Sequence, residues 1–216
     1  MPLPDSFCWT RFGTEAGQSV GQIFGRKEEE RAANAGVFFW GIGNAIGPSM
    51  AELLRRTCAP EVLFSPIKST ARPQDCAPEA VVAWQEGETL DGKRYRLPAQ
   101  SLITSRCSLN SSSETHFALV CYSERPLARM DSVESVHFGE LRNVVSGRRI
   151  GASQVTAVVE RDDATKSKGT SYEVFLRAFL VPPFFLRLRQ PRVLPKPEID
   201  KTWADIVSRM WRERAM

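Results

Sequence analysis

The stretch VFFWGIGNAIGPS, residues 37–49, places a bulky apolar run directly before a segment of small residues. An apolar run of this kind is typical of a strand that is buried on both faces. The glycines and the proline that follow let the backbone turn sharply or approach another group closely. Two interpretations are open: either a core strand ends here, or Trp40 forms one wall of a pocket whose floor is backbone.

The sequence on either side of this stretch predicts further strands and helices. Residues 6–13, SFCWTRFG, alternate two sets of side chains and predict a strand. Residues 15–35 are polar with a few apolar residues at helical spacing, which predicts a helix with one thin buried stripe. In residues 49–56, SMAELLRR, Ser49 and Glu52 have the spacing of a capping box and predict the start of a short helix.

The remainder of the chain is dominated by strand signals. Further strands are expected at residues 61–67, 80–86, 116–123, 154–161 and 171–181. Asp91-Gly92 predicts a tight hairpin turn. Many short strands with few helices favour an α+β fold with a mixed barrel or strongly bent sheet over an alternating βαβ fold. We expect one domain over residues 1–190, followed by a Pro-rich connector and an amphipathic helix, residues 191–216, packed on it.

Composition narrows the classes of protein to consider. The 216 residues, 42% of them hydrophobic, are enough for one substantial core. The start of the chain does not look like a secretion signal, and the longest apolar run is too short to span a bilayer, so no membrane partner is expected. The five cysteines are scattered and suit neither a disulfide framework nor a zinc site, which predicts a reducing, cytoplasmic setting.

The chain is poor in the residues that usually carry catalysis. It has two histidines and lacks the common motifs of metal-assisted hydrolysis, nucleophilic triads and phosphate-binding loops. The segment GIGNAIG is not a dinucleotide fingerprint, since the expected acidic residue and second strand do not follow it. We therefore expect no catalytic residue, no metal site and no cofactor, and a binding module is favoured over an enzyme.

Four segments occur in an order that resembles a known family. They are FCWTRFG, FFWGIGN, EVLFSPIKS and VVAWQE, and they cover residues 6–90 by element order and residue type. In this order they resemble the PUA-like superfamily, and within it the YTH and EVE type of modified-base reader. The resemblance implies a PUA-like mixed β-barrel with peripheral helices, and an aromatic pocket that recognises a modified base.

Aromatic faces can recover the stacking energy of a base removed from its stack, at about 1–3 kcal/mol per base. Backbone groups at a Gly-rich turn can read the edge of that base, and arginines and lysines can contact the neighbouring phosphates. The expected base pocket consists of Trp9, Arg11, Trp40, Gly41, Ile42, Asn44, Ser65 and Trp84. The expected phosphate contacts are Lys68, Arg72, Arg148 and Arg149.

The predicted function is a module that binds DNA or RNA at a methylated or flipped base, in a setting such as bacterial defence or restriction. Each tryptophan taken alone is more typical of core packing. One alternative is an enzyme of the same fold that processes a nucleotide or RNA with Lys68 or Glu86. Another is a protein-interaction subunit whose C-terminal helix docks on a nuclease or helicase.

Overall fold

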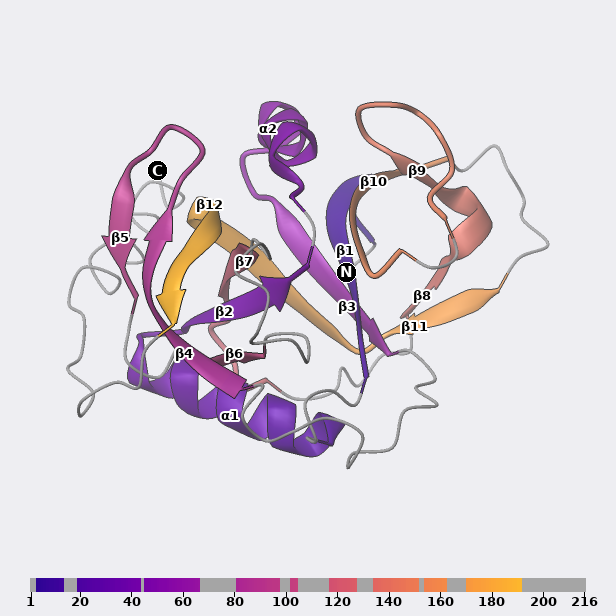
Figure 1. The fold of residues 1–216 in the computed structure, drawn as a ribbon. Helices are drawn as coiled ribbons and strands as arrows, with labels where there is room; N and C mark the ends of the chain where they lie inside the picture. Colours follow the sequence, from indigo (N-terminus) through magenta and orange to yellow (C-terminus); the bar gives the residue numbers. More distant parts are fainter. Residues whose placement is uncertain are drawn as a thin grey trace, which may run out of the picture. The chain divides into compact units, whose positions relative to one another are not determined.

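A computed structural model shows an α+β protein, mostly strands in a mixed sheet, with two α-helices in the part of the chain that it describes (Figure 1). The described residues are 3–13, 19–43, 45–66, 81–97, 102–104, 117–127, 134–151, 154–162 and 170–191. The chain divides into two compact units, each built from three segments. Unit 1 comprises Met1–Gly13, Asn44–Lys68 and Ala128–Leu180, and unit 2 comprises Thr14–Gly43, Ser69–Leu127 and Val181–Met216.

The sheet of unit 1 is organised around its first strand. β1 (Ser6–Phe12) lies between β3 (Glu61–Pro66), which runs parallel to it, and β10 (Thr156–Arg161), which runs antiparallel (Figure 1). The first residues of β12 (Leu176–Pro191) pair with the other edge of β3, and β9 (Leu141–Asn143) pairs with β10. β1 is therefore a central strand, and its position explains why four consecutive residues, 7–10, are all buried.

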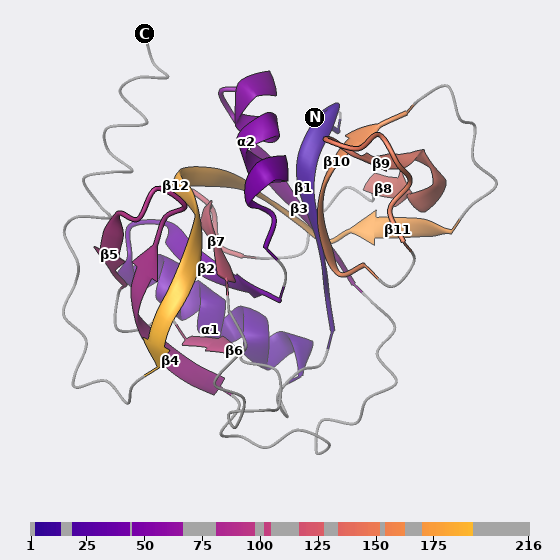
Figure 2. The same ribbon diagram turned by 45° about the horizontal axis from the view of Figure 1, so that its top comes forward.

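Both faces of β1 are used for packing. Phe7 and Trp9 point into an apolar cluster that also contains Leu63, Leu141 and Val159. The opposite face carries a polar group, which is satisfied: the hydroxyls of Thr10 and Thr156 lie 2.9 Å apart, within hydrogen-bond distance. A small sheet of β8 (Glu134–His137) and β11 (Ser171–Val174) lies beside β9 and β10 (Figure 2).

The helix predicted at residues 49–56 is present, but the predicted capping box is wrong. α2 spans Gly47–Arg56 and has Ile46 as its N-cap, without a side-chain hydrogen bond. The helix begins earlier because Pro48, which has no N–H to satisfy, is well suited to the first turn. Ser49 therefore lies inside the helix, where it cannot act as the N-cap, and Glu52 is turned to other partners.

Unit 2 contains the predicted long helix and the predicted strand that begins at Val37. α1 spans Val20–Ala33, and β2 spans Val37–Ile42. The capping box of unit 2 is at α1, where Gln22 N–H donates to Ser19 Oγ at 3.3 Å and Ser19 N–H donates to Gln22 Oε1 at 2.8 Å. β2 pairs along its whole length with β7 (Phe117–Tyr122), which confirms a buried strand at this position.

The other strands of unit 2 include the predicted hairpin. β4 (Val81–Glu88) pairs antiparallel with β5 (Arg94–Arg96), with β6 (Leu102–Thr104) and with the later part of β12. Gly92 has a φ of 84°, in the left-handed region that the turn between β4 and β5 requires. The Asp91-Gly92 turn predicted from the sequence is therefore confirmed.

In neither unit do the described strands close into the predicted barrel. Pairing in unit 1 ends at β9, and in unit 2 it ends at β2, β5 and β6. Three of these edge strands have three residues each, too few for long ladders around a ring. The C-terminal helix predicted within 191–216 lies outside the described residues. No helix in the described part of the chain is long and apolar enough to cross a membrane.

Candidate nucleic-acid interface

A tightly braced turn, residues 143–149, follows β9 in unit 1; we call it the basic turn. Its backbone closes on Asn143, whose N–H donates to the carbonyl of Arg148 at 2.8 Å and whose carbonyl accepts from Gly147 N–H at 2.8 Å. The Asn143 side-chain oxygen also accepts from the N–H groups of Val145 and Ser146, each at 3.0 Å. Gly147 has a φ of 63°. This network holds the tip of the turn in one shape.

The basic turn presents one apolar and two cationic side chains to solvent. Val144 and Ile150 are buried at its base, while all residues from 145 to 149 are exposed. Val145 is 57% exposed although it is apolar. Within the described ranges, no ion pair joins Arg148 or Arg149 to a carboxylate. Both arginines lie at the exposed tip of the turn.

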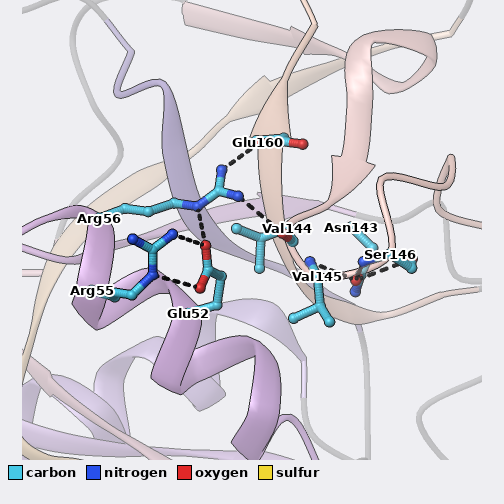
Figure 3. Close-up of polar contacts among 8 residues, drawn as sticks. All are labelled: Glu52, Arg55, Arg56, Asn143, Val144, Val145, Ser146 and Glu160. Atoms are coloured by element: carbon cyan, nitrogen blue, oxygen red, sulfur yellow. Dashed lines mark hydrogen bonds and ion pairs between the residues drawn. The ribbon is translucent and has the colours of Figure 1, made fainter.

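The end of α2 is fastened to this turn (Figure 3). Arg56 donates through Nη2 to the carbonyl of Val144 at 3.1 Å, and its Nη1 forms an ion pair with Glu160 of β10. Arg56 Nε also donates to Glu52 Oε1 at 2.7 Å, and Arg55 Nη2 donates to the same oxygen at 2.7 Å. The helix, the turn and β10 are thus connected through one guanidinium group.

The surface formed by the end of α2 and the basic turn carries more arginines than carboxylates among the described residues. Hydrogen bonds from Arg55 and then Arg56 lower the pKa of Glu52 to about 2, so this carboxylate stays ionised. Glu52 and Glu160 together offset the charges of Arg55 and Arg56. Among the described residues of this surface, the two arginines of the exposed tip, Arg148 and Arg149, are not offset by such an ion pair. We call the surface formed by Arg55, Arg56, Val145, Arg148 and Arg149 the basic edge.

A second feature of unit 1 is a group of three aromatic rings, Trp9, Phe138 and Tyr172, next to Arg11. The Trp9 and Tyr172 rings are 5.6 Å apart in an edge contact, and Phe138 lies 5.9 Å from Trp9. The Arg11 guanidinium carbon is 4.7 Å from the centre of the Tyr172 ring, a distance typical of a cation–π contact. Trp9 is wholly buried, and its indole N–H donates to Ser65 Oγ at 3.1 Å.

Unit 1 therefore brings together three of the residues predicted for the base pocket: Trp9, Arg11 and Ser65. Sequence reasoning missed Phe138 and Tyr172, which complete the aromatic group. Tyr172 is half-buried on β11, and that strand is positioned by pairing with β8 rather than by its own pattern. The alternating SYEV segment was the available signal, but it indicated a strand and not a partner for Trp9.

Other predicted pocket residues belong to unit 2. Trp40 is 9% exposed, and its ring lies 5.7 Å from that of Phe24 on α1. Trp84 on β4 is 5% exposed. Gly41 and Ile42 continue β2 opposite β7. Both tryptophans are buried to the extent typical of core side chains. For residues 37–49 this favours the first interpretation, in which a core strand ends there. The predicted residues Asn44, Lys68 and Arg72 lie outside the described residues.

The described part of the chain contains no group of three or more His, Cys, Asp or Glu side chains that could hold a metal ion. No protein-family model matches the chain, and no significant match was found among curated proteins or solved structures. The interpretation of the site therefore depends on its geometry and charge.

Proposed function

We propose that this chain is a nucleic-acid-binding module whose basic edge contacts the phosphate backbone. The observation that carries the proposal is the pair Arg148 and Arg149, held in solvent on a braced turn without a carboxylate partner among the described residues. Guanidinium groups bind phosphate oxygens in a bidentate manner, and a polymer of phosphates can occupy several arginines at once. Such contacts give affinity and position without reading sequence.

We further propose that a base is recognised beside Arg11, and that the base is methylated or flipped, in DNA or RNA. The Arg11 guanidinium lies over the Tyr172 ring, and bases stack on aromatic rings and on guanidinium planes. Arg11, Phe138 and Tyr172 are each half-buried, so they combine packing with access from solvent. Trp9 supports this group from within the core.

The proposed fold type is PUA-like. Its support is the order β1, α1, β2, α2, β3, β4, which is the order of elements on which the resemblance depends. The resemblance adds the modified-base preference, while the basic edge supports nucleic-acid binding independently of it.

The proposal is tested by fluorescence-polarisation binding of labelled DNA and RNA oligonucleotides at several salt concentrations. We expect the Arg148→Gln/Arg149→Gln variant to bind more weakly than the unsubstituted protein. Its plot of log K against log salt should be shallower by about two, since each phosphate contact contributes a slope near one. The matched control is Arg94→Gln/Arg125→Gln, which removes two exposed arginines of unit 2 and should bind unchanged. Equal loss in both variants, or no binding at low salt, would refute the proposal.

Base recognition is tested with the same probes carrying 5-methylcytosine, 5-hydroxymethylcytosine or 6-methyladenine. A preference of at least about tenfold, or about 1.4 kcal/mol, would identify the base. Arg11→Met keeps an apolar stem but removes the guanidinium plane, so it should abolish the preference in a folded protein. If Trp40→Ala removes the preference and Arg11→Met does not, the base is bound at Trp40 and the role assigned to Arg11 is wrong.

A further inference from the structure

Val145 is an apolar side chain held in water by a rigid support. Among the described residues, Val145 and Leu90 are the large hydrophobic side chains that remain exposed, at 57% and 69%. Leu90 also lies on a hydrogen-bonded turn that leads to exposed Lys93 and Arg94, but Asp91 follows it directly. The turn of Val145 differs because residues 144–149 include two arginines and no acidic residue. An exposed apolar group beside exposed arginines fits a partner that has apolar surface next to phosphates.

We propose that Val145 is a wedge that enters a groove of duplex nucleic acid and unstacks a base step, while Arg148 and Arg149 contact the flanking phosphates. The proposal deepens the proposed function and rests on it, because it names a duplex as the substrate class. Proteins that deform duplexes insert apolar side chains between base steps and place arginines in or beside the same groove.

The support of the turn is suited to this task. A wedge must resist the restoring force of the base stack, and the Asn143 side-chain oxygen holds the backbone N–H groups of Val145 and Ser146. Arg56 connects the turn to the rest of unit 1, since it contacts the Val144 carbonyl, Glu52 of α2 and Glu160 of β10 (Figure 3). A flexible loop would yield to the stack instead of opening it.

Two other partners fit the tip less well. Single-stranded nucleic acid is bound mainly by aromatic platforms on which bases stack, and residues 144–149 carry no aromatic side chain. A bilayer surface is held by several large apolar groups or a lipid chain, and one valine supplies little of this surface. A duplex needs one small rigid apolar group and adjacent cations, which is what the turn provides.

The wedge is tested with DNA duplexes that contain 2-aminopurine, whose fluorescence rises when it is unstacked. Val145→Ala removes apolar surface without touching the turn's hydrogen bonds, and Leu90→Ala is the matched control. We expect binding of the unsubstituted protein to raise the fluorescence. Val145→Ala should abolish that rise and weaken duplex binding about tenfold, while single-strand binding is unchanged. Val145→Phe should restore or increase the rise, a gain that misfolding cannot produce.

The possible failures are distinguishable. If Arg148→Gln/Arg149→Gln weakens duplex binding but Val145→Ala and Val145→Phe behave as the unsubstituted protein, the wedge is refuted and nucleic-acid binding stands. If Val145→Ala weakens single-strand and duplex binding equally, Val145 is a simple contact and the wedge is again refuted. If the protein binds anionic phosphatidylserine vesicles through Val145 and binds no oligonucleotide, both proposals fall.

Discussion

The buried charges of unit 2 give the sharpest stability prediction. Glu30 is wholly buried, and its Oε2 accepts from Lys27 Nζ at 2.5 Å while its Oε1 accepts from the N–H of Phe39 at 3.1 Å. Lys27 is 2% exposed. Burial lowers the pKa values of Lys27 and Arg26, and the Glu30 carboxylate opposes the lowering in both. The Glu30 carboxylate therefore offsets buried positive charge on both of these α1 side chains.

This arrangement predicts an unequal response to substitution. Glu30→Gln leaves Lys27 and Arg26 facing a neutral amide, and we expect a loss of about 3–5 kcal/mol in the free energy of unfolding. Lys27→Met should cost less, about 1–3 kcal/mol, because Arg26 still faces the carboxylate. The double variant Lys27→Met/Glu30→Gln should be more stable than Glu30→Gln alone. It removes one buried cation, while the glutamine oxygen can still accept from the N–H of Phe39.

The assay is urea unfolding followed by circular dichroism, at neutral and at alkaline pH. In Glu30→Gln the pKa of Lys27 in the folded state falls further below its value of 10.5 in the unfolded chain. Between these two pKa values the unfolded chain binds more protons than the folded protein. The loss in free energy of unfolding caused by Glu30→Gln should therefore shrink as pH rises through that window. A deficit that grows with pH, or a double variant less stable than Glu30→Gln, would refute the reasoning.

Three further outcomes are expected. Gly36→Ala should lower the free energy of unfolding by at least about 2 kcal/mol in thermal unfolding, because φ is 94° and the new Cβ would lie 2.5 Å from a ring carbon of Tyr122. Gly25→Ala, in open space on α1, should raise it by about 0.5–1 kcal/mol. Ser65→Ala should cost about 1–3 kcal/mol in urea, since it removes the acceptor of the buried Trp9 indole N–H; an unchanged midpoint would mean that this bond contributes nothing. The Glu52 carboxyl carbon should titrate near pH 2 by NMR, so its contacts are present above pH 4.5 and are lost as pH falls toward 2; replacing both arginine partners by glutamine should return the titration to the usual range.

The sequence predicts strands well where burial is continuous or alternating. Residues 37–41 are read as a core strand because an apolar run has few other stable environments, and the structure has a strand there. Prediction from the sequence fails where tertiary contacts decide whether a polar residue is buried. Lys27 and Glu30 have the spacing of a solvated helical pair, and their burial depends on the N–H of Phe39 in the next strand. Similarly, Pro48 moved the start of α2 away from the predicted serine cap.

Three residues of the aromatic group, Trp9, Arg11 and Ser65, were predicted from the sequence, whereas the basic edge was predictable only in its charge. Arg148 and Arg149 stand out in the sequence because arginines cluster there. The exposure of Val145 does not, since an isolated valine is usually buried and the turn that raises it depends on the Asn143 side chain. The position of Tyr172 beside Trp9 is a long-range consequence of the pairing between β8 and β11, and local pattern carries no information about it.

The assignment of β12 to both units has a consequence for biosynthesis. Six alternating segments make up the two units, so the chain passes between them five times. The outer edge of β3 is paired by residues 176–179, and β4 is paired by residues 187–191 of the same strand. During translation, neither unit can complete its sheet until β12 has left the ribosome. Nascent chains that stop before residue 176 therefore leave the β12-facing edges of β3, β4 and β7 open, which is the state most exposed to chaperones and to aggregation.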